Sequence, residues 1–409
     1  MRTSTPLILA CIPLLVGCSL EQRLDSVSAK IHQQFADSKS WNELPLRVIS
    51  WEQALAMINR SNTGITEAKN AIDDAERQSI SVYTEMIPGV SYYGYLTKSI
   101  KQLSNEFSVS DLNSDVNITF YLPSLTRIPY RVYASQATTF AAMKALEGKQ
   151  RELAAQLYKL VRTRELNMQQ RELDSKEPDR SVQDKMMDVK NYADADSAHW
   201  IAMCELLGDY SARWQVLPSS VPKLQWSKYE SKLKRLDDLI VCMYALRLEQ
   251  ARLAQYQVAL NYLPTINTSL YSPSLFSSSG GTYEGSFLSG EDTRLNLSLS
   301  YSFDTQLTTW NTYRKAKHRY EVVQREVMAG VIDHKMKLQT LRSSVREYNN
   351  WRSYMLKRID YLQAQPTMTA TELIERDKTV LAMKKELLSQ AISAVESESA
   401  LIIEYGIVR

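Results

Sequence analysis

The chain repeats one succession of elements, and this duplication constrains its fold more than any other feature. Pro88 matches Pro264 and Tyr95 matches Tyr271, each at an offset of 176 positions. In both copies a run with helical periodicity ends at a Leu-Pro or Ile-Pro step and continues as an extended segment. We therefore predict a first repeat over 49–215, an inter-repeat linker over 216–232 and a second repeat over 233–409.

Each copy contains two segments in which apolar and polar residues alternate. The clearest is in the second copy, where Leu295, Leu297 and Leu299 alternate with Asn296 and Ser298. Such alternation gives a strand one apolar and one polar face. A polar loop joins the segments of each pair, which favours hairpins. The predicted strands are about 89–98 and 114–122 in the first repeat, and about 265–273 and 295–304 in the second.

A long helical hairpin is predicted after each strand pair. Apolar residues recur at spacings of three and four, as at Leu153, Leu157 and Leu160, which is typical of coiled-coil packing. Only 12 Gly and 12 Pro interrupt the chain. The helices turn near 177–181 and 365–370, and at 45 to 55 residues each would reach roughly 65 to 80 Å. The fold class is thus mainly α with a small transmembrane β part.

The four extended segments are long enough to cross a bilayer as tilted strands. A four-stranded sheet would leave the backbone groups of its edges unpaired in lipid, at several kcal/mol each, so copies must join to close it. Eight strands form a barrel filled by its own side chains, and three or more copies are needed for a lumen. The alternative is a surface-tethered coiled coil whose apolar alternations pack on its own helices.

The N-terminus resembles a lipoprotein signal peptide. Arg2 precedes an apolar run over 7–16, which is too short to span a bilayer, and the run ends in Leu15-Val16-Gly17-Cys18. We predict cleavage after residue 17, diacylglycerol and an acyl chain on Cys18, and a polar tether over 18–48. The alternative is an ordinary signal peptide with a chance cysteine. Because Ser19 and not Asp follows the cysteine, outer-membrane delivery is expected.

Several functions lack support in the sequence. The formal charge of +3 is spread without a polybasic run, so no nucleic-acid partner is expected. The four histidines lack metal-ligand spacing, and no phosphate loop or nucleophile elbow is found. We therefore expect no enzyme, no metal and no cofactor beyond the lipid on Cys18. Methionines such as Met186 and Met187 are interpreted as helix-seam filler in preference to metal ligands. Whether Cys204 and Cys242 pair is left open.

From Trp51 to Gly406 the chain resembles the TolC-like outer-membrane efflux proteins. The resemblance depends on the order and duplication of individually weak motifs. These are the Trp51-x-x-Ala54-Leu55 opening, Pro88 and Pro264 before the strands, the helix ends Leu206-Leu207-Gly208 and Tyr405-Gly406, and the linker from Leu217-Pro218 to Pro222-Lys223-Leu224.

The resemblance implies a homotrimer with a twelve-stranded outer-membrane β-barrel on a long α-helical coiled-coil barrel. An equatorial belt would form from the linker and the C-terminal end. The trimer would be lipid-anchored, contact outer-membrane lipid and extend into the periplasm of a bacterium. It would passively conduct substrate delivered by an inner-membrane pump through a periplasmic adaptor.

The second tip is similar to a family pattern, Gly-Thr-x-Thr/Ser-x-x-Asp-x-x-Asp, whose acidic pair lines the periplasmic mouth. Carried over, Glu372 and Glu375 are gate candidates, and Asp184 matches Glu372 in the first tip. Alternatively, these acids only stabilise helix N-termini. The chain departs from the pattern by Pro for Gly and Glu for Asp. The adaptor-docking candidates are Pro178, Asp179, Arg180, Ser181, Pro366, Thr367, Met368 and Thr369.

Two other classes of protein are alternatives. A periplasmic adaptor would carry one helical hairpin between Gly-rich halves, whereas this chain has two hairpins and little Gly outside its predicted loops. A structural coiled-coil lipoprotein without a pore, at the cell surface or in the periplasm, would lack the strands and remains the main alternative.

Overall fold

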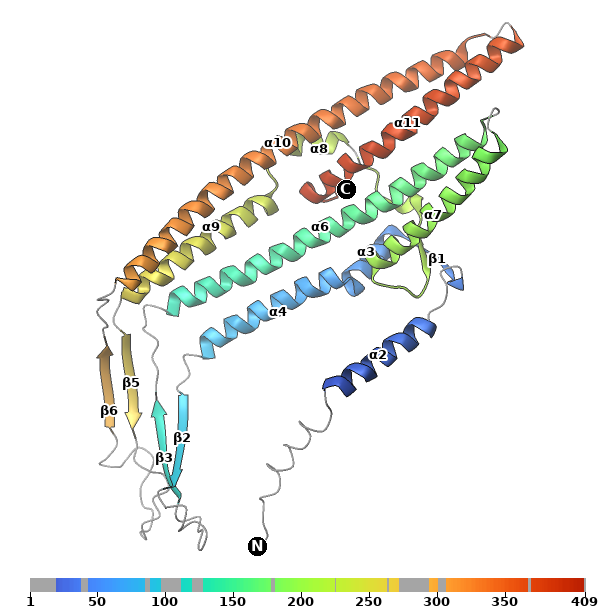
Figure 1. The fold of residues 1–409 in the computed structure, drawn as a ribbon. Coiled ribbons are helices and arrows are strands. Elements are labelled where there is room, and N and C mark those ends of the chain that lie inside the picture. Colours follow the sequence, from blue (N-terminus) through green and yellow to red (C-terminus); the bar gives the residue numbers. More distant parts are fainter. Residues whose placement is uncertain are drawn as a thin grey trace.

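The computed structural model describes residues 20–37, 43–84, 89–96, 112–119, 128–177, 181–224, 226–262, 265–271, 294–300, 307–366 and 369–407. The molecule is elongated, with four strands at one end, two helix-hairpin tips at the other and long helices between them (Figure 1). Among the described residues, no helix combines the length and apolar character needed to cross a membrane.

The helices fall into long and short members. The bounds are α2 Leu20–Asp37, α3 Trp51–Ser61, α4 Thr63–Thr84, α6 Ile128–Ser175, α7 Val182–Leu207, α8 Trp226–Lys232, α9 Asp238–Ala259, α10 Thr308–Ala364 and α11 Ala370–Tyr405. Two short 3₁₀ turns cover Pro218–Ser220 (η3) and Leu260–Tyr262 (η4).

The prediction of 45 to 55 residues holds for α6, at 48, and nearly for α10, at 57, but it is wrong for the returning helices. Helix α7 has 26 residues and α11 has 36. Both end before a glycine with positive φ, Gly208 and Gly406, each at 68°, a conformation that ends helices. Helices α4 and α9 lie along the remaining lengths of α6 and α10, so helix pairs continue toward the strands (Figure 1).

The strands form one antiparallel sheet in the order β2-β3-β5-β6, and within the described residues β2 and β6 are its edge strands. Their bounds are β2 Gly89–Leu96, β3 Leu112–Thr119, β5 Thr265–Tyr271 and β6 Arg294–Ser300. Among the described residues, the two hairpins pair Asn117 with Tyr271 and Ile118 with Leu270. The strands overlap the predicted ranges, and β3 begins two residues earlier. Predicted positions 97–98, 120–122, 272–273 and 301–304 lie outside the described residues.

A second, parallel sheet pairs β1 (Leu46–Ile49) with β4 (Arg213–Val216). The tether predicted over 18–48 therefore contains helix α2 and most of a strand, and the predicted boundary at 215/216 divides β4. Arg213 Nε also donates to the Leu44 carbonyl at 2.9 Å. Four-residue strands whose partners are far apart in sequence leave no readable periodicity, which explains why β1 and β4 were missed.

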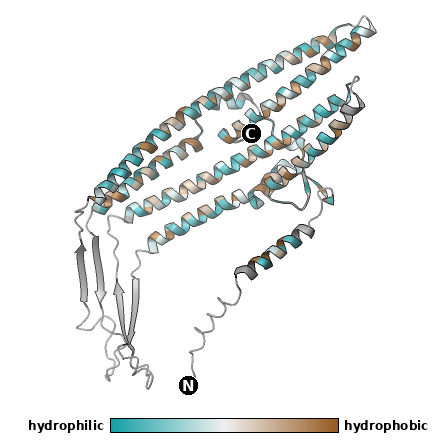
Figure 2. Cartoon of the chain, in the orientation of Figure 1, coloured by the Kyte–Doolittle hydropathy of each residue, from teal (hydrophilic) through white to brown (hydrophobic). Residues whose placement is uncertain are grey.

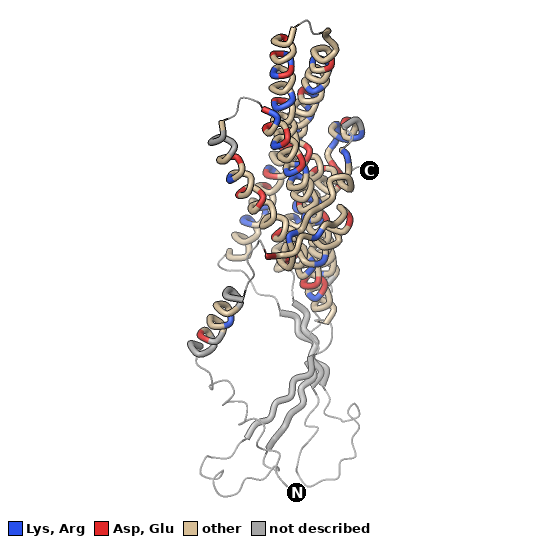
Figure 3. The backbone as a smooth tube through the Cα atoms, turned by 90° about the vertical axis from the view of Figure 1, so that its right-hand side faces the viewer, with Lys and Arg blue, Asp and Glu red and all other residues tan. Residues whose placement is uncertain are grey.

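The main core gathers residues of α3, α6, α7, β4 and α11. Leu153 and Leu157 of α6 pack with Leu207 of α7, Trp214 of β4 and Ile402 of α11. A second cluster joins α8, α10 and the end of α11, and a third joins the distal halves of α10 and α11. Leu373, in the first turn of α11, is 38% exposed and lies outside these clusters. Figure 2 shows hydrophobic positions interspersed with hydrophilic ones along the helices, and Figure 3 shows both charge signs mixed along them.

Candidate functional site at the helix-hairpin tips

The second tip begins α11 with a capping box. The Glu372 backbone amide donates to Thr369 Oγ1 at 3.3 Å, and the Thr369 amide donates to Glu372 Oε2 at 2.9 Å. This exchange satisfies backbone donors that the first helical turn leaves without partners. The Glu372 carboxylate therefore has a structural partner within its own helix, although the residue as a whole is exposed.

Arg376 closes the same tip one turn further along. Its Nη1 donates to the Gln365 carbonyl at the end of α10 at 3.2 Å, and its Nη2 lies 3.5 Å from Asp377 Oδ1. The Arg376 guanidinium thus connects the C-terminal end of α10 to the N-terminal part of α11. Because Gln365 no longer continues α10, its carbonyl is one of the acceptors that helix ends leave open.

Lys385 joins the second hairpin to the first. Its Nζ lies 2.9 Å from Asp174 Oδ1 and 2.6 Å from Glu177 Oε2, at the C-terminal end of α6. Burial lowers the pKa of Lys385, but hydrogen bonds to Glu177 and Asp174 outweigh it and raise the pKa overall. Lys385 therefore carries a positive charge that bridges the two hairpins just below the first tip.

The first hairpin is held by a matching set of contacts between α6 and α7. The Tyr192 hydroxyl donates to Asp174 Oδ2 at 2.9 Å. Arg171 pairs with both carboxylate oxygens of Asp196, at 2.9 and 3.3 Å, and stacks over the Tyr192 ring at 4.3 Å. Asp174 consequently accepts from Tyr192 of its own hairpin while it pairs with Lys385 of the other.

A half-buried aromatic and cationic cluster lies farther from the tip in the same hairpin. The Arg164 guanidinium lies 4.1 Å from the Trp200 ring centre, and the His199 ring meets Trp200 edge-on at 5.6 Å. Burial, together with the nearby positive charge of Arg164, lowers the pKa of His199 to about 4. His199 is therefore a neutral packing residue at neutral pH.

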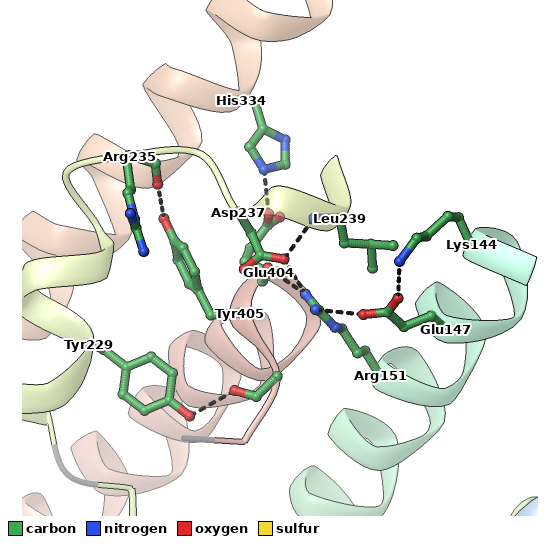
Figure 4. A network of polar contacts seen from close by, with 11 residues as sticks. Lys144, Glu147, Arg151, Tyr229, Arg235, Asp237, Leu239, His334, Glu404 and Tyr405 are labelled. Carbon is green, nitrogen blue, oxygen red and sulfur yellow. Dashed lines mark hydrogen bonds and ion pairs between the residues drawn. The ribbon is translucent and has the colours of Figure 1, made fainter. Parts of the chain in front are cut away.

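A second polar network lies at the C-terminal end of α11 (Figure 4). Arg151 of α6 pairs with Asp237 at 2.6 Å and donates to the Glu404 carbonyl at 3.1 Å. His334 of α10 pairs with the Glu404 carboxylate, whose pKa is raised by burial. Asp237 also caps α9 by accepting from the Leu239 amide. The network fastens α6, α9, α10 and α11 to one another.

Tyrosines complete this junction. The Tyr229 hydroxyl of α8 donates to the Gly406 carbonyl, and the Tyr405 hydroxyl donates to the Arg235 carbonyl, each at 2.9 Å. Burial raises the pKa of Tyr405 to about 12. Since α8 belongs to the region between the repeats, these bonds attach that region to the C-terminal end of the chain.

The structure describes some of the predicted gate and docking residues and not others. Glu372 and Glu375 are exposed in the first turns of α11, and Asp184 lies in the first turn of α7. Thr369 and Glu372 are brought together by the capping box, and Pro366 and Ser181 are exposed beside their helices. The gate and docking roles of these residues stay predictions. Cys18, Pro178, Asp179, Arg180, Thr367 and Met368 lie outside the described residues.

Sequence reasoning missed Lys385, Asp174 and Arg376, the residues that connect the helices around the tips. Charged residues three or four apart near helix ends were visible at 171, 174 and 177, but they were compatible with solvated helix surfaces. Only the tertiary structure shows which partners lie across from them. The two cysteines left open are free in the structure, with Cys204 buried.

No three His, Cys, Asp or Glu side chains gather into a possible metal site within the part of the chain that the structure describes. This finding covers only those residues, and the tip segments 178–180 and 367–368 are outside it. The chemistry of the described tips is accordingly that of ion pairs, hydrogen bonds and exposed carboxylates.

No protein-family model and no curated protein matches the sequence, whereas solved structures do match the fold. VceC, an outer membrane protein of Vibrio cholerae, is 11% identical with a TM-score of 0.58, over 87% of this chain and 96% of that one. The open-state MtrE outer membrane channel of Neisseria gonorrhoeae is 15% identical with a TM-score of 0.57, over 87% and 89%. The CmeC outer membrane channel of Campylobacter jejuni is 12% identical with a TM-score of 0.53, over 87% and 85%.

These likenesses confirm the TolC-like fold. They extend over most of the length of each solved chain. The matched proteins are named as outer membrane proteins and channels, not enzymes, which agrees with the expectation of a non-enzyme. At identities this low, fold similarity by itself assigns no function.

Proposed function

We propose that the chain forms a homotrimeric exit duct in the bacterial outer membrane, as part of a tripartite efflux or secretion system. Substrate would arrive from an inner-membrane pump through a periplasmic adaptor and leave passively. Diacylglycerol and an acyl chain on Cys18 would anchor each copy. The proposal is supported by the fold that the chain shares with outer membrane channels.

The single observation that carries the proposal is the open four-stranded sheet. Its outer strands β2 and β6 have no partner strand on their far sides within the described residues. Backbone groups in lipid must be paired, and a sheet at membrane depth is stable only when closed. Pairing of β6 from one copy with β2 from the next would close the sheet. Three copies would give twelve strands and a lumen.

The helices support the same arrangement on the periplasmic side. Helices α4, α6, α9 and α10 lie side by side and end next to the strands (Figure 1). Rotation about the axis that closes the sheet would therefore close these helices into a tube. The hairpin tips, at the far end from the strands, would form its mouth. The exposed acids Glu372 and Glu375, with Asp184, are the candidates for lining that mouth.

In this arrangement, the Lys385 ion pairs near the tips would affect how the mouth opens. Because Lys385 binds the end of α6 to α11, it opposes separation of the two hairpins within a copy. An adaptor that docks on the exposed tip residues would act beside this contact. We infer that opening of the mouth requires the Lys385 ion pairs to lengthen or break.

The test is the oligomeric state and conductance of the purified, acylated protein. Native mass spectrometry in detergent should give a trimer, and planar bilayers should show discrete ion-conducting steps. A monomer that leaves bilayers electrically silent would instead support the alternative, a coiled-coil structural lipoprotein without a pore. Protease access to the segment around Gly280-Gly281 on intact cells provides a second check, because a conduit exposes that loop outside.

A further inference from the structure

Helix α2 carries an apolar stripe that is exposed in the described part of the chain. Leu24, Val27 and Ile31 recur at spacings of three and four, and each exposes more than half of its surface. Residues with this spacing share one face of a helix. Figures 1 and 3 both show α2 standing apart from the other helices. An amphipathic helix of 18 residues gains most of its stability by packing such a face.

A groove of matching character lies between α4 and α6, at the end of these helices nearest the strands. It has a volume of about 450 Å³. Its apolar members Ile80, Phe140 and Met143 are between 44% and 61% exposed. The groove is bordered by polar side chains, namely Glu76, Ser79, Gln136 and Thr139. Exposed apolar side chains gathered in this way mark an interaction surface.

Two attachments restrict where α2 can lie. Its first residue follows the predicted lipidated Cys18 by two positions, and its last residue precedes strand β1 by nine. The lipid would hold one end at the membrane, and pairing of β1 with β4 holds the other near the middle of the molecule. Helix α2 must therefore run along the helical wall between these two levels, antiparallel to α4, which runs toward the strands.

The lengths agree with a position over the groove. If Val27 lies opposite Ile80, Leu20 lies roughly 10 Å nearer the strands at 1.5 Å per residue. Helix α4 ends at Thr84, about 6 Å beyond Ile80, and β2 begins at Gly89. Cys18 would then reach the level at which helix gives way to strand, where the membrane surface is expected.

The charged residues Lys30 of α2 and Glu76 of α4 are placed consistently with this antiparallel alignment. With Val27 opposite Ile80 and the helices antiparallel, Lys30 and Glu76 both lie one turn farther from the strands and thus at one level. Both side chains are exposed in the structure, so an ion pair between them requires no burial of charge.

We propose that α2 docks through Leu24, Val27 and Ile31 into the α4/α6 groove of its own chain. The inference rests on the proposed outer-membrane duct, because the membrane anchor sets the level of α2. The same chain is favoured over a neighbouring copy because the eight residues from 38 to 45 reach at most roughly 28 Å. The docked helix would brace the outside of the wall beside the membrane.

The experiment compares two cysteine pairs in the full-length acylated protein. Val27→Cys with Ile80→Cys places thiols on the proposed contact, and Ala29→Cys with Ile80→Cys is the matched control. Ala29 is two residues away and exposed, but it lies on the opposite face of α2. Each single variant is included to detect disulfides with the native Cys204 and Cys242.

The first pair should form a disulfide within one chain at least several-fold faster than the control pair, as seen by peptide mass spectrometry. Equal rates for the two pairs would overturn the docking, and a disulfide-linked dimer would overturn its assignment to the same chain. Conductance is measured on the same preparations. A conducting trimer without the preferred disulfide would reject only the docking of α2, whereas an electrically silent monomer would reject the duct itself.

Discussion

The ammonium of Lys385 on α11 lies 2.9 Å from Asp174 Oδ1 at the end of α6, and this ion pair joins the two helical hairpins near their tips. Lys385 is 21% exposed and Asp174 is 13% exposed. Asp174 also accepts from Tyr192 of α7. Helices α6, α7 and α11 thus meet at the Asp174 carboxylate near the tips. A change of charge there should affect the relative position of the two hairpins.

Lys385→Met should make the proposed mouth easier to open. The substitution keeps the aliphatic stem but removes both ion pairs, so the two hairpins of one copy lose their ionic contacts near the tips. We expect a higher open probability or conductance in planar bilayers. The melting temperature should change little, since a partly exposed pair typically contributes about 0.2–1 kcal/mol. Lys384→Met, at the exposed neighbouring residue, is the control. Identical conductance in the two variants would contradict a gating role for Lys385.

Replacing the tip acids should separate their two interpretations. Glu372→Gln keeps a side chain that can complete the capping box but removes its charge, so thermal stability should be unchanged. If Glu372 and Glu375 line the mouth, Glu372→Gln and Glu375→Gln should each reduce the preference for cations. That preference is measured as the reversal potential across a salt gradient. Unchanged reversal potentials would leave these acids with only a helix-terminal role.

His199 should make the protein less stable in mild acid. Its pKa of about 4 in the fold lies below the ordinary 6.5, so the unfolded chain binds a proton that the folded chain does not. Stability is therefore lost as pH falls from about 6.5 toward 4, by up to about 3 kcal/mol. His199→Phe should reduce the loss in melting temperature between neutral pH and about pH 5. His318→Phe, at an exposed position of α10, should follow the wild-type curve.

Replacement by alanine should lower the unfolding free energy at Gly208 and raise it at Gly148. Gly208 has φ of 68°, and a Cβ there would lie 2.3 Å from the Ser61 carbonyl oxygen. Gly208→Ala should destabilise the protein by at least about 2 kcal/mol, because it adds both backbone strain and a backbone clash. Gly148 lies inside α6 with nothing within 4 Å of an added Cβ. Gly148→Ala should therefore raise the unfolding free energy by about 0.5–1 kcal/mol. Denaturant unfolding monitored by circular dichroism measures both changes.

Local periodicity predicted the elements that bury one face over many residues. The long helices α6 and α10 and the four strands of the larger sheet lie where spacing or alternation indicated them. The prediction of equally long returning helices was wrong, although Gly208 and Gly406 were visible as helix ends. The sequence shows where α7 and α11 stop. It does not show that α4 and α9 take their places beside the longer helices.

The remaining features depend on residues distant in sequence. Strand β1 is defined by its pairing with β4, and the Lys385 bridge joins α11 to α6, more than 200 positions apart. The Arg151 network likewise gathers α6, Asp237 and the end of α11. A charged residue on a helix has the same local signature whether solvent or an opposite charge faces it.

The sequence by itself determined the duplicated succession of helix, strand pair and helical hairpin, because hydrophobic periodicity is a local property of each element. Only the tertiary structure decided which helices lie side by side, where the short sheet forms and which charges join the hairpins. Those outcomes depend on packing and Coulomb interactions between segments that the chain brings together only when folded.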